Sequence, residues 1–184
     1  MKKHILASLI AFGTFFITSC TAQKVGQSSV VEKSTEEMIL GEFKQQDLTK
    51  NNYATWYLPE YTEYEVESVK LKGLEDKVSE YDIVTFIGTW CGDSKRELPR
   101  LYKILESVNY PIVSKMKVYG VNREKKTTKG LEKGKSITHV PTIIFYKDGK
   151  EVGRIVESPV TGYLEEDIAM IVSGTPLTPN YAEN

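Results

Sequence analysis

The sequence predicts an α/β domain with a central mixed sheet flanked by helices, preceded by a helical, tyrosine-rich extension. Three observations support this class. A β-rich apolar run at 82–90 is typical of a strand buried on both faces, and an amphipathic helical pattern follows it directly at 91–108. A strand pattern at 116–121 and a strand–turn–strand pattern at 142–156 supply the rest of the sheet.

The first twenty residues have the pattern of a targeting signal. Residues 1–19 begin with two lysines after Met1 and continue with a mostly apolar run at 5–17. A helix of that run spans roughly 20 Å, less than the ~30 Å hydrocarbon core of a bilayer. The ending, Ile-Thr-Ser-Cys at 17–20, resembles a bacterial lipobox. We expect a lipoprotein signal peptide, cleavage before Cys20 and a lipid anchor on its thiol; the alternative is a plain secretory signal in which Cys20 is incidental.

The segment that follows predicts a tether and an extension. Residues 20–36 are polar without an apolar period, which is typical of a flexible tether between membrane and domain. With the lipobox resemblance, this implies a domain held outside the cytoplasm at the bacterial cell envelope. The extension, 37–80, contains a predicted amphipathic helix at 37–48 and a weaker helical segment at 66–78. Between them, 53–64 is dense in tyrosine; such aromatics form a carbohydrate or peptide platform or, as we prefer, pin the extension onto the core.

The elements after residue 81 follow from periodicity and turn signals. Pro99 lies inside the helical pattern and predicts a kink. The lysine-rich segment 128–137 is a short helix or a loop, and Asp148-Gly149 predicts a two-residue hairpin turn. An amphipathic pattern at 163–172 predicts the last helix, and we expect the tail, 175–184, to be loose.

Composition excludes several classes of function. The 184 residues include 24 basic and 25 acidic side chains, so the net charge of −1 gives no electrostatic excess for binding nucleic acid. Two cysteines and two histidines cannot build a disulfide framework or a zinc cluster, and we expect no metal and no cofactor. Chemistry therefore depends on one or two special residues, of which Cys91 is the only thiol after position 20.

Four spaced features form an ordered set around that thiol. They are Trp90-Cys91-Gly92 at the strand-to-helix junction, Pro99 eight residues after Cys91, Val140-Pro141-Thr142 before a strand, and Gly149 eight residues after Pro141. This set resembles the thioredoxin superfamily. The resemblance implies that 81–174 forms a thioredoxin-like domain in which the Val140–Pro141 peptide bond is cis.

The position of Cys91 predicts a nucleophile. A thiol at a helix N-terminus meets unpaired N–H groups and the positive end of the helix dipole, which favour the thiolate. The resemblance implies that Trp90, Gly92, Val140 and Pro141 line a groove in which the backbone pairs with an extended substrate. The alternative for Cys91 is an inert core cysteine, which the junction position disfavours.

Two departures from the family pattern change the expected chemistry. Ser94 stands where thioredoxin has its resolving cysteine, so Cys91 can form mixed disulfides but cannot close an internal one. That fits disulfide isomerisation, removal of small-thiol caps, or retention of client thiols. Ser94 either donates a hydrogen bond to the Cys91 thiolate or caps the helix. Thr85 stands where the family has a buried aspartate. Glu157 and His139 are the candidates to replace it as proton acceptor, and we prefer the alternative that both are ordinary solvated loop residues.

The expected partners are disulfide- or thiol-bearing envelope proteins, or small thiols, together with the membrane that holds the lipid on Cys20. A rival reading is a non-catalytic scaffold that binds envelope proteins through the groove at Trp90 and Pro141 without turnover.

Overall fold

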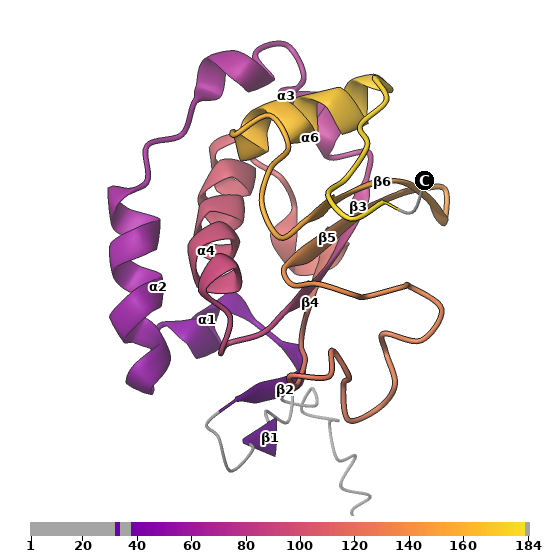
Figure 1. Ribbon diagram of the computed structural model, residues 1–184. Coiled ribbons are helices and arrows are strands. Elements are labelled where there is room, and N and C mark those ends of the chain that lie inside the picture. Colours follow the sequence, from indigo (N-terminus) through magenta and orange to yellow (C-terminus); the bar gives the residue numbers. More distant parts are fainter. Residues whose placement is uncertain (1–31, 34–37, 183–184) are drawn as a thin grey trace, which may run out of the picture.

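The computed structural model describes residues 32–33 and 38–182, and its centre is a six-stranded mixed sheet of order β1-β2-β4-β3-β5-β6 (Figure 1). The strands are β1 (Glu32–Lys33), β2 (Ile39–Phe43), β3 (Asp82–Ile87), β4 (Met116–Gly120), β5 (Thr142–Lys147) and β6 (Lys150–Val156). The helices are α1 (Gln45–Leu48), α2 (Asn51–Glu63), the 3-10 helix η1 (Ser68–Leu71), α3 (Glu75–Val78), α4 (Gly92–Ser107), α5 (Ile112–Lys115) and α6 (Leu164–Ser173). The expected α/β class and thioredoxin-like fold are confirmed.

The expected signal peptide, the anchor at Cys20 and most of the tether lie outside the described residues. Across 38–182, none of the helices combines the length and the apolar character that crossing a bilayer requires.

Strand pairing places β3 at the middle of the sheet. β3 runs parallel to β4 and antiparallel to β5, and β5 and β6 form the predicted hairpin. Asp148 and Gly149 take φ values of 51° and 75° at its turn, the left-handed region that Asp-Gly tolerates better than most pairs. Because β3 is paired on both sides, its C-terminal end, where Cys91 follows, is held from two directions.

The prediction of a helix over 37–48 is wrong for its first half. Residues 39–43 form β2, which pairs antiparallel with β4, and only Gln45–Leu48 is helical. The apolar residues fit the period of a helix and that of a strand. The strand forms because the edge of β4 offers backbone hydrogen-bonding groups that residues 39–43 can pair with. The two strands approach so closely that a Cβ on Gly120 would lie 2.1 Å from the Ile39 carbonyl oxygen. The extension is therefore part of the sheet.

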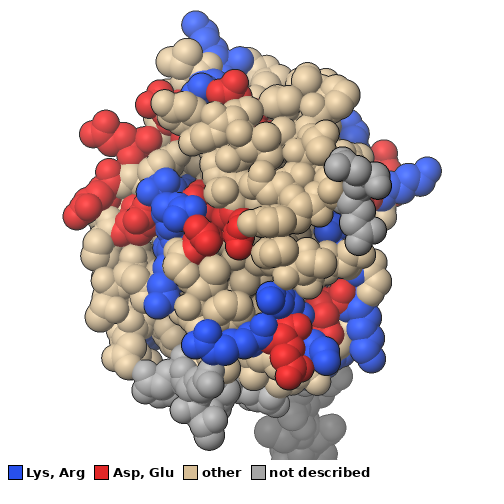
Figure 2. Space-filling model, viewed as in Figure 1, with Lys and Arg blue, Asp and Glu red and all other residues tan. Residues whose placement is uncertain are grey.

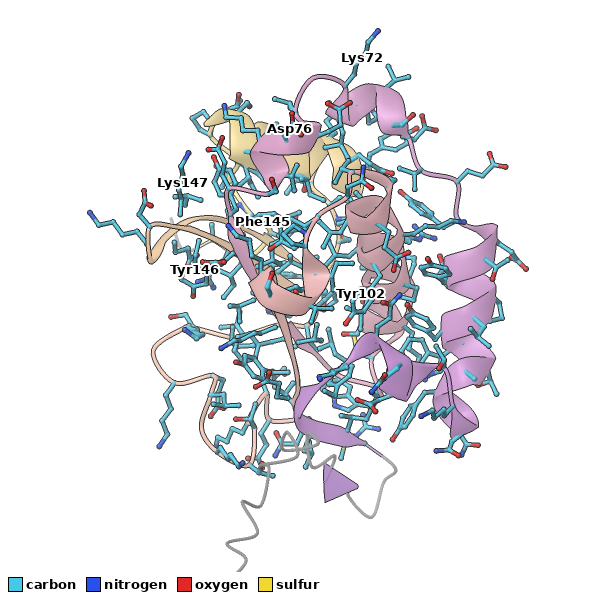
Figure 3. All side chains as sticks on the ribbon, turned by 180° about the vertical axis from the view of Figure 1, so that it is seen from behind. Lys72, Asp76, Tyr102, Phe145, Tyr146 and Lys147 are labelled. Atoms are coloured by element: carbon cyan, nitrogen blue, oxygen red, sulfur yellow. The ribbon has the colours of Figure 1, made fainter. Side chains whose placement is uncertain are left out.

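The two faces of the sheet are covered differently. Ile83 and Ile87 on β3 join the large core formed with α4 and α6, and Figure 3 shows Tyr102 of α4 and Phe145 of β5 within this half of the molecule. Phe86, which alternates with them, joins a smaller cluster with Val140 on the opposite face. That second face is covered by the loop 121–141, which contains neither helix nor strand, so the segment 128–137 is a loop.

Helix α2 packs along α4 (Figure 1), and aromatic side chains of α2 make much of the contact. Tyr57 is 1% exposed, stacks on Tyr61 at 5.7 Å and meets Tyr102 edge-on at 6.3 Å. The Tyr61 hydroxyl donates to Glu106 of α4, and that bond raises the pKa of Tyr61 to about 12. The expectation that the tyrosine-rich segment pins the extension to the core is confirmed.

The last segments differ in how far they match expectation. The helical pattern at 66–78 is realised as η1 and α3, separated at Gly73, and α6 matches the prediction at 163–172 closely. The tail, expected to be loose, instead makes defined contacts as far as residue 181. Asn180 donates from Nδ2 to the carbonyls of Val156, the last residue of β6, and of Ser158, which follows it, at 3.1 and 3.0 Å.

Candidate functional site

Cys91 is the N-cap residue of α4, the 16-residue helix that leaves the end of β3. Its backbone is extended, with φ −92° and ψ 130°, and its carbonyl accepts the first intrahelical bond from Lys95 at 3.1 Å. The side chain is half-buried, so the sulfur is reachable from solvent yet close to the unpaired N–H groups of the first helical turn. Gly92, the next residue, has open space where a Cβ would be. The expected position of the Cys91 thiol at the N-terminus of a helix is confirmed.

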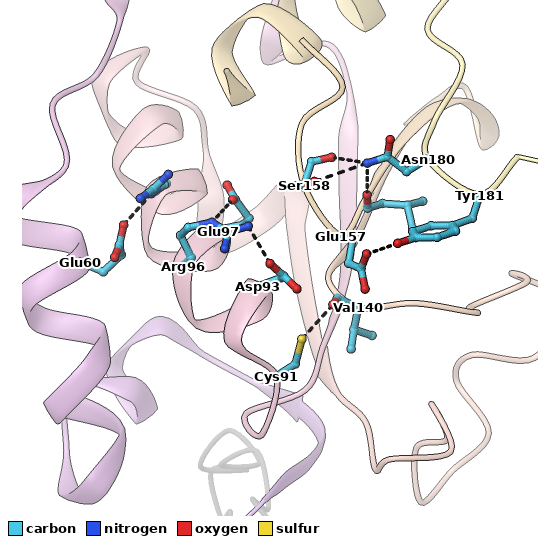
Figure 4. A network of polar contacts seen from close by, with 12 residues as sticks. Glu60, Cys91, Asp93, Arg96, Glu97, Val140, Glu157, Ser158, Asn180 and Tyr181 are labelled. Atoms are coloured by element: carbon cyan, nitrogen blue, oxygen red, sulfur yellow. Dashed lines mark hydrogen bonds and ion pairs between the residues drawn. The ribbon is translucent and has the colours of Figure 1, made fainter. Parts of the chain in front are cut away.

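The loop before β5 completes the site. The Val140–Pro141 peptide bond is cis, as predicted, and the Cys91 thiol donates to the Val140 carbonyl oxygen at 3.1 Å (Figure 4). Val140 is buried and Pro141 is covered as well, so the loop is fixed beside the sulfur. The arrangement places a thiol and a backbone acceptor side by side.

Trp90 forms the wall next to the thiol. Its Nε1 donates to the Val121 carbonyl at 3.0 Å, and its ring lies so close to the backbone of Gly88 that a Cβ there would be 2.5 Å from Cε2. Glycine is therefore required at 88 by the approach of the ring. Arg123 covers the outer side of Trp90, with its guanidinium carbon 5.2 Å from the ring centroid.

Ser94 does neither of the two things expected of it. Its side chain is 0% exposed, and its Oγ accepts a hydrogen bond from the Gly88 N–H at 3.1 Å. The residue thus ties the first turn of α4 to the end of β3, behind Cys91. A hydroxyl in this place stabilises the junction and supplies no second sulfur.

Thr85 occupies the position of the family's aspartate and is fully buried. Its Oγ1 has no hydrogen-bond partner among the residues that the structure describes. A neutral hydroxyl cannot take a proton from the thiol at physiological pH. Thr85 therefore does not replace the aspartate as a proton acceptor.

Glu157 and His139 both contact Tyr181 near the cis-proline loop, and Figure 4 shows the contact of Glu157 with Tyr181. The Tyr181 hydroxyl donates to Glu157 Oε2 at 2.5 Å, and its ring stacks on His139 with centroids 3.8 Å apart. The Glu157 N–H donates to the Pro141 carbonyl at 2.7 Å with φ +66°, a region that favours glycine. The structure thus places Glu157 and His139 at the loop beside the site. The hydrogen-bond partner of the Cys91 thiol, however, is the Val140 carbonyl and neither of these two side chains.

A carboxylate–guanidinium network runs along α4 from the site (Figure 4). Arg96 donates to Asp93 at 2.7 Å and to Glu97 at 2.6 Å, so the charge of Asp93 beside Cys91 is partly compensated. Glu97 is 2% exposed, and burial raises the pKa of its carboxyl above the ordinary value despite Arg96. Its Oε2 has no partner within the described part of the chain.

Arg123 and Tyr181 are the site residues that sequence reasoning missed. Arg123 lies two residues past the predicted strand end, and the basic character of the segment after it was the only available signal. Nothing in the tail sequence indicates that Tyr181 returns to the cis-proline loop.

The chain is similar in sequence to known proteins. The sequence model of the thioredoxin family matches residues 65–170. A thioredoxin-like protein of Acanthamoeba polyphaga mimivirus is 36% identical over 86 residues, which cover 47% of this chain and 58% of the relative. Thioredoxin-2 of Saccharomyces cerevisiae is 34% identical over 74 residues, 40% of this chain and 64% of the relative. The chain thus spans less than two thirds of the length of these relatives.

Solved structures with partial similarity include oxidised mitochondrial thioredoxin 3 of Saccharomyces cerevisiae, at 21% identity and a TM-score of 0.32 over 53% of this chain and 86% of that one. A protein of unknown function from Pseudomonas aeruginosa has 14% identity and a TM-score of 0.40 over 70% and 82%. The family match extends over more than half of the residues and includes the thiol junction and the cis-proline loop, so the chain belongs to the thioredoxin family.

Proposed function

We propose that this protein is a membrane-anchored thiol–disulfide exchange protein that uses Cys91 as its single nucleophile. The observation that carries the proposal is the placement of the Cys91 sulfur at the N-terminus of α4, 3.1 Å from the Val140 carbonyl of the cis-proline loop. The names of the relatives, a thioredoxin-like protein and a thioredoxin, support exchange chemistry of this general kind.

The first step is the attack of the Cys91 thiolate on one sulfur of a substrate disulfide. The proton of the thiol passes to solvent, a Cys91–substrate disulfide forms, and the other substrate sulfur leaves as a thiolate. The bond between the thiol and Val140 is given up in this step, which frees the carbonyl to accept a backbone N–H of the substrate. No net oxidation or reduction occurs, since one disulfide replaces another.

The second step must use a thiol from outside the site. Ser94 offers only a buried hydroxyl that is bonded to Gly88, and an alcohol does not displace a thiolate from a disulfide. Release therefore depends on another thiol of the substrate, a small thiol, or a partner protein. Isomerisation, removal of small-thiol caps and retention of client thiols all share this chemistry and differ in which thiol arrives.

The decisive experiment replaces Ser94 in a Cys20→Ser background, where Cys91 is the only thiol of the chain. Proteins are loaded with a peptide that has a single cysteine, activated as its mixed disulfide with 2-thiopyridine, and the lifetime of the protein–peptide disulfide is followed by mass spectrometry after the released thiopyridone is removed. Ser94→Cys should release the peptide and form an internal disulfide, whereas wild-type Ser94 should hold it. Ser94→Ala is the matched control, because it also loses the hydroxyl but gains no sulfur, and it should hold the peptide too.

The result that overturns the proposal is a wild-type protein that forms no mixed disulfide with any disulfide offered. In that case the site is a binding scaffold, and the peptide should still bind without covalent capture.

The anchor rests on the lipobox-like sequence at 17–20 and the polar stretch that follows. Expressed in a bacterium, the full chain should appear in the membrane fraction with acyl mass on an N-terminal Cys20, and Cys20→Ser should leave the protein without that mass. An unmodified N-terminus downstream of Cys20, in a soluble protein, contradicts the anchor.

A further inference from the structure

The segment 174–182, which follows α6, returns to the thiol site. Figure 1 draws it in yellow on its way back toward β6, and none of its side chains is charged. Figure 2, in the same view, shows an area without charged side chains in the middle of this face. Leu177 packs against the main core, and Asn180 donates to the two carbonyls at the end of β6. These two contacts give the segment a defined path to the site.

Tyr181 contacts the cis-proline loop on both sides of Val140, whose carbonyl is the partner of the Cys91 thiol. The Tyr181 ring stacks on His139, the residue before Val140, with centroids 3.8 Å apart and planes 10° apart. Its hydroxyl donates to Glu157, whose own N–H donates to the Pro141 carbonyl. At 57% exposure the ring is not part of the core, so its contacts with this loop determine where it lies.

The Tyr181 hydroxyl also lies within electrostatic reach of α4. The hydrogen bond to Glu157 and the charge of that carboxylate raise the pKa of Tyr181 above its ordinary value, and the charge of Asp93 raises it further. Asp93 is the second residue of α4 and comes two positions after Cys91. Because such an effect weakens with distance, the hydroxyl is bonded on the loop side of the thiol and close to its helix side as well. Figure 4 shows these residues together.

Both partners of the Tyr181–Glu157 hydrogen bond have a backbone conformation that side chains disfavour. Their φ values are +61° for Tyr181 and +66° for Glu157, in the left-handed region. Such conformations cost free energy and are found where other contacts outweigh the cost, often at functional sites. The strain offsets part of what the hydrogen bond and the ring stack contribute. The segment can therefore leave the loop without unfolding the domain.

We propose that Tyr181 is a specificity-determining residue of the Cys91 site. It fills the groove beside Val140, so that Cys91 reacts faster with a disulfide whose attacked sulfur carries a short chain than with one inside an extended peptide. A peptide that lies along the loop advances about 3.3 Å per residue, so it meets the Tyr181 ring within one or two residues of its cysteine and must displace the segment. This inference rests on the proposed thiol chemistry of Cys91.

The test compares two uncharged probes that share one leaving group, in the Cys20→Ser background. One is 2-hydroxyethyl 2-pyridyl disulfide, and the other is a peptide with a single cysteine between glycine and serine residues, activated as its mixed disulfide with 2-thiopyridine. In both, the Cys91 thiolate bonds to the sulfur of the hydroxyethyl group or the peptide, the thiol proton passes to solvent, and thiopyridone leaves. The absorbance of thiopyridone gives the rate.

Reaction of each probe with 2-mercaptoethanol in solution gives the ratio of their intrinsic reactivities. Relative to that ratio, the wild-type protein should prefer the short probe. Tyr181→Ala should raise the rate of the peptide relative to the short probe about threefold to tenfold, because the peptide no longer displaces a ring stack and a hydrogen bond. Tyr181→Phe keeps the ring but loses the bond to Glu157, and its effect should be smaller.

Tyr163→Ala is the matched control. Tyr163 is also an exposed tyrosine, at 45%, but its ring lies 4.2 Å from Nζ of Lys70 on η1 and not on the cis-proline loop. Its removal should leave the ratio of the two rates as in wild type.

Three outcomes separate the ideas. If Tyr181→Ala slows the peptide relative to the short probe, Tyr181 helps to bind peptides and the inference is wrong. An unchanged ratio in Tyr181→Ala also overturns it while leaving the thiol chemistry intact. No reaction of the wild-type protein with either probe overturns the proposed function itself.

Discussion

Two regions of this protein are rich in aromatic side chains next to charged ones, yet their polar atoms are directed differently. On α2 and at its C-cap, the hydroxyls of Tyr61 and Tyr64 donate to Glu106 and Glu165, which belong to α4 and α6. At the thiol, Trp90 is held from behind while its outer side faces the exposed Arg123. The first region uses its polar groups to join helices, whereas the second uses them to hold a tryptophan ring next to a half-buried thiol.

The comparison teaches that aromatic density does not by itself indicate a binding site. The segment 53–64 has four tyrosines and a tryptophan, more than the thiol site, and its residues pack against the core. What would distinguish the proposed site is a thiol that folding leaves partly accessible. Cys91 meets that condition, because its side chain is half-buried at the end of a helix.

The largest effect should come from Cys91→Ser. In the Cys20→Ser background this substitution removes the last sulfur that can attack, so mixed-disulfide formation should fall to zero. Serine has nearly the same size, and the melting temperature should stay close to that of the parent. Mass spectrometry after incubation with a peptide disulfide checks the first point, and thermal unfolding the second. Residual capture would mean that the sulfur of Cys91 is not the nucleophile.

Tyr57→Ala should affect the other region, with the opposite pattern. The side chain is 1% exposed between α2 and α4, so its loss should lower the free energy of unfolding by about 3–5 kcal/mol. Urea unfolding measures this change, and Cys91 should still form mixed disulfides in the folded protein. Tyr57→Phe is the control: it loses only the hydroxyl that accepts from Gln45, for a cost of about 0.5–1.5 kcal/mol. A similar cost for both would show that packing does not dominate.

Gly88→Ala should have an intermediate effect that joins stability to the site. The new methyl would lie 2.5 Å from the Trp90 ring, so the ring must move, at a cost of about 1–3 kcal/mol. Gly92→Ala is the matched control, since nothing lies within 4 Å of its Cβ position, and it should be neutral or slightly stabilising. Tryptophan fluorescence should shift in the first variant alone. Unchanged fluorescence and stability in Gly88→Ala would contradict the close approach of the ring.

The smallest effect concerns the pH dependence of stability through Glu97. Burial raises the pKa of this carboxyl above the ordinary 4.5, so its protonated form favours the folded state. The contribution is complete below about pH 4.5 and is lost as the pH rises through the folded-state pKa. Relative to wild type, Glu97→Gln should therefore gain stability between pH 4.5 and 7.

Glu80 provides the opposite sign for that measurement. Its hydrogen bond with Lys147 lowers the pKa of the carboxyl, so its contribution is present above pH 4.5 and lost as the pH falls further. Glu80→Gln should therefore lose stability relative to wild type at neutral pH and approach it in acid. Parallel curves for the two variants would rule out the role of burial at Glu97.

Much of the fold followed from local patterns. The strand at 82–87, the helix that carries Pro99 and the Asp148-Gly149 hairpin each depend on periodicity or on backbone conformations that few residues tolerate. The segment 39–43 could not be assigned this way, because its apolar positions fit a helix or a strand and the edge of β4 selects the strand. Its partner lies about eighty positions away in the sequence, beyond any local rule.

For the site, the sequence alone determined where the thiol of the domain lies and that no second cysteine accompanies it. One cysteine after a buried strand, a serine three residues later and a Val-Pro before the next strand are fixed whatever the remaining contacts are. Only the tertiary structure decided what surrounds that thiol. Ser94 accepts a hydrogen bond from Gly88, Tyr181 donates one to Glu157, and the guanidinium of Arg123 lies over the Trp90 ring. Such contacts depend on where separate segments meet in space, and side-chain chemistry alone does not encode that meeting.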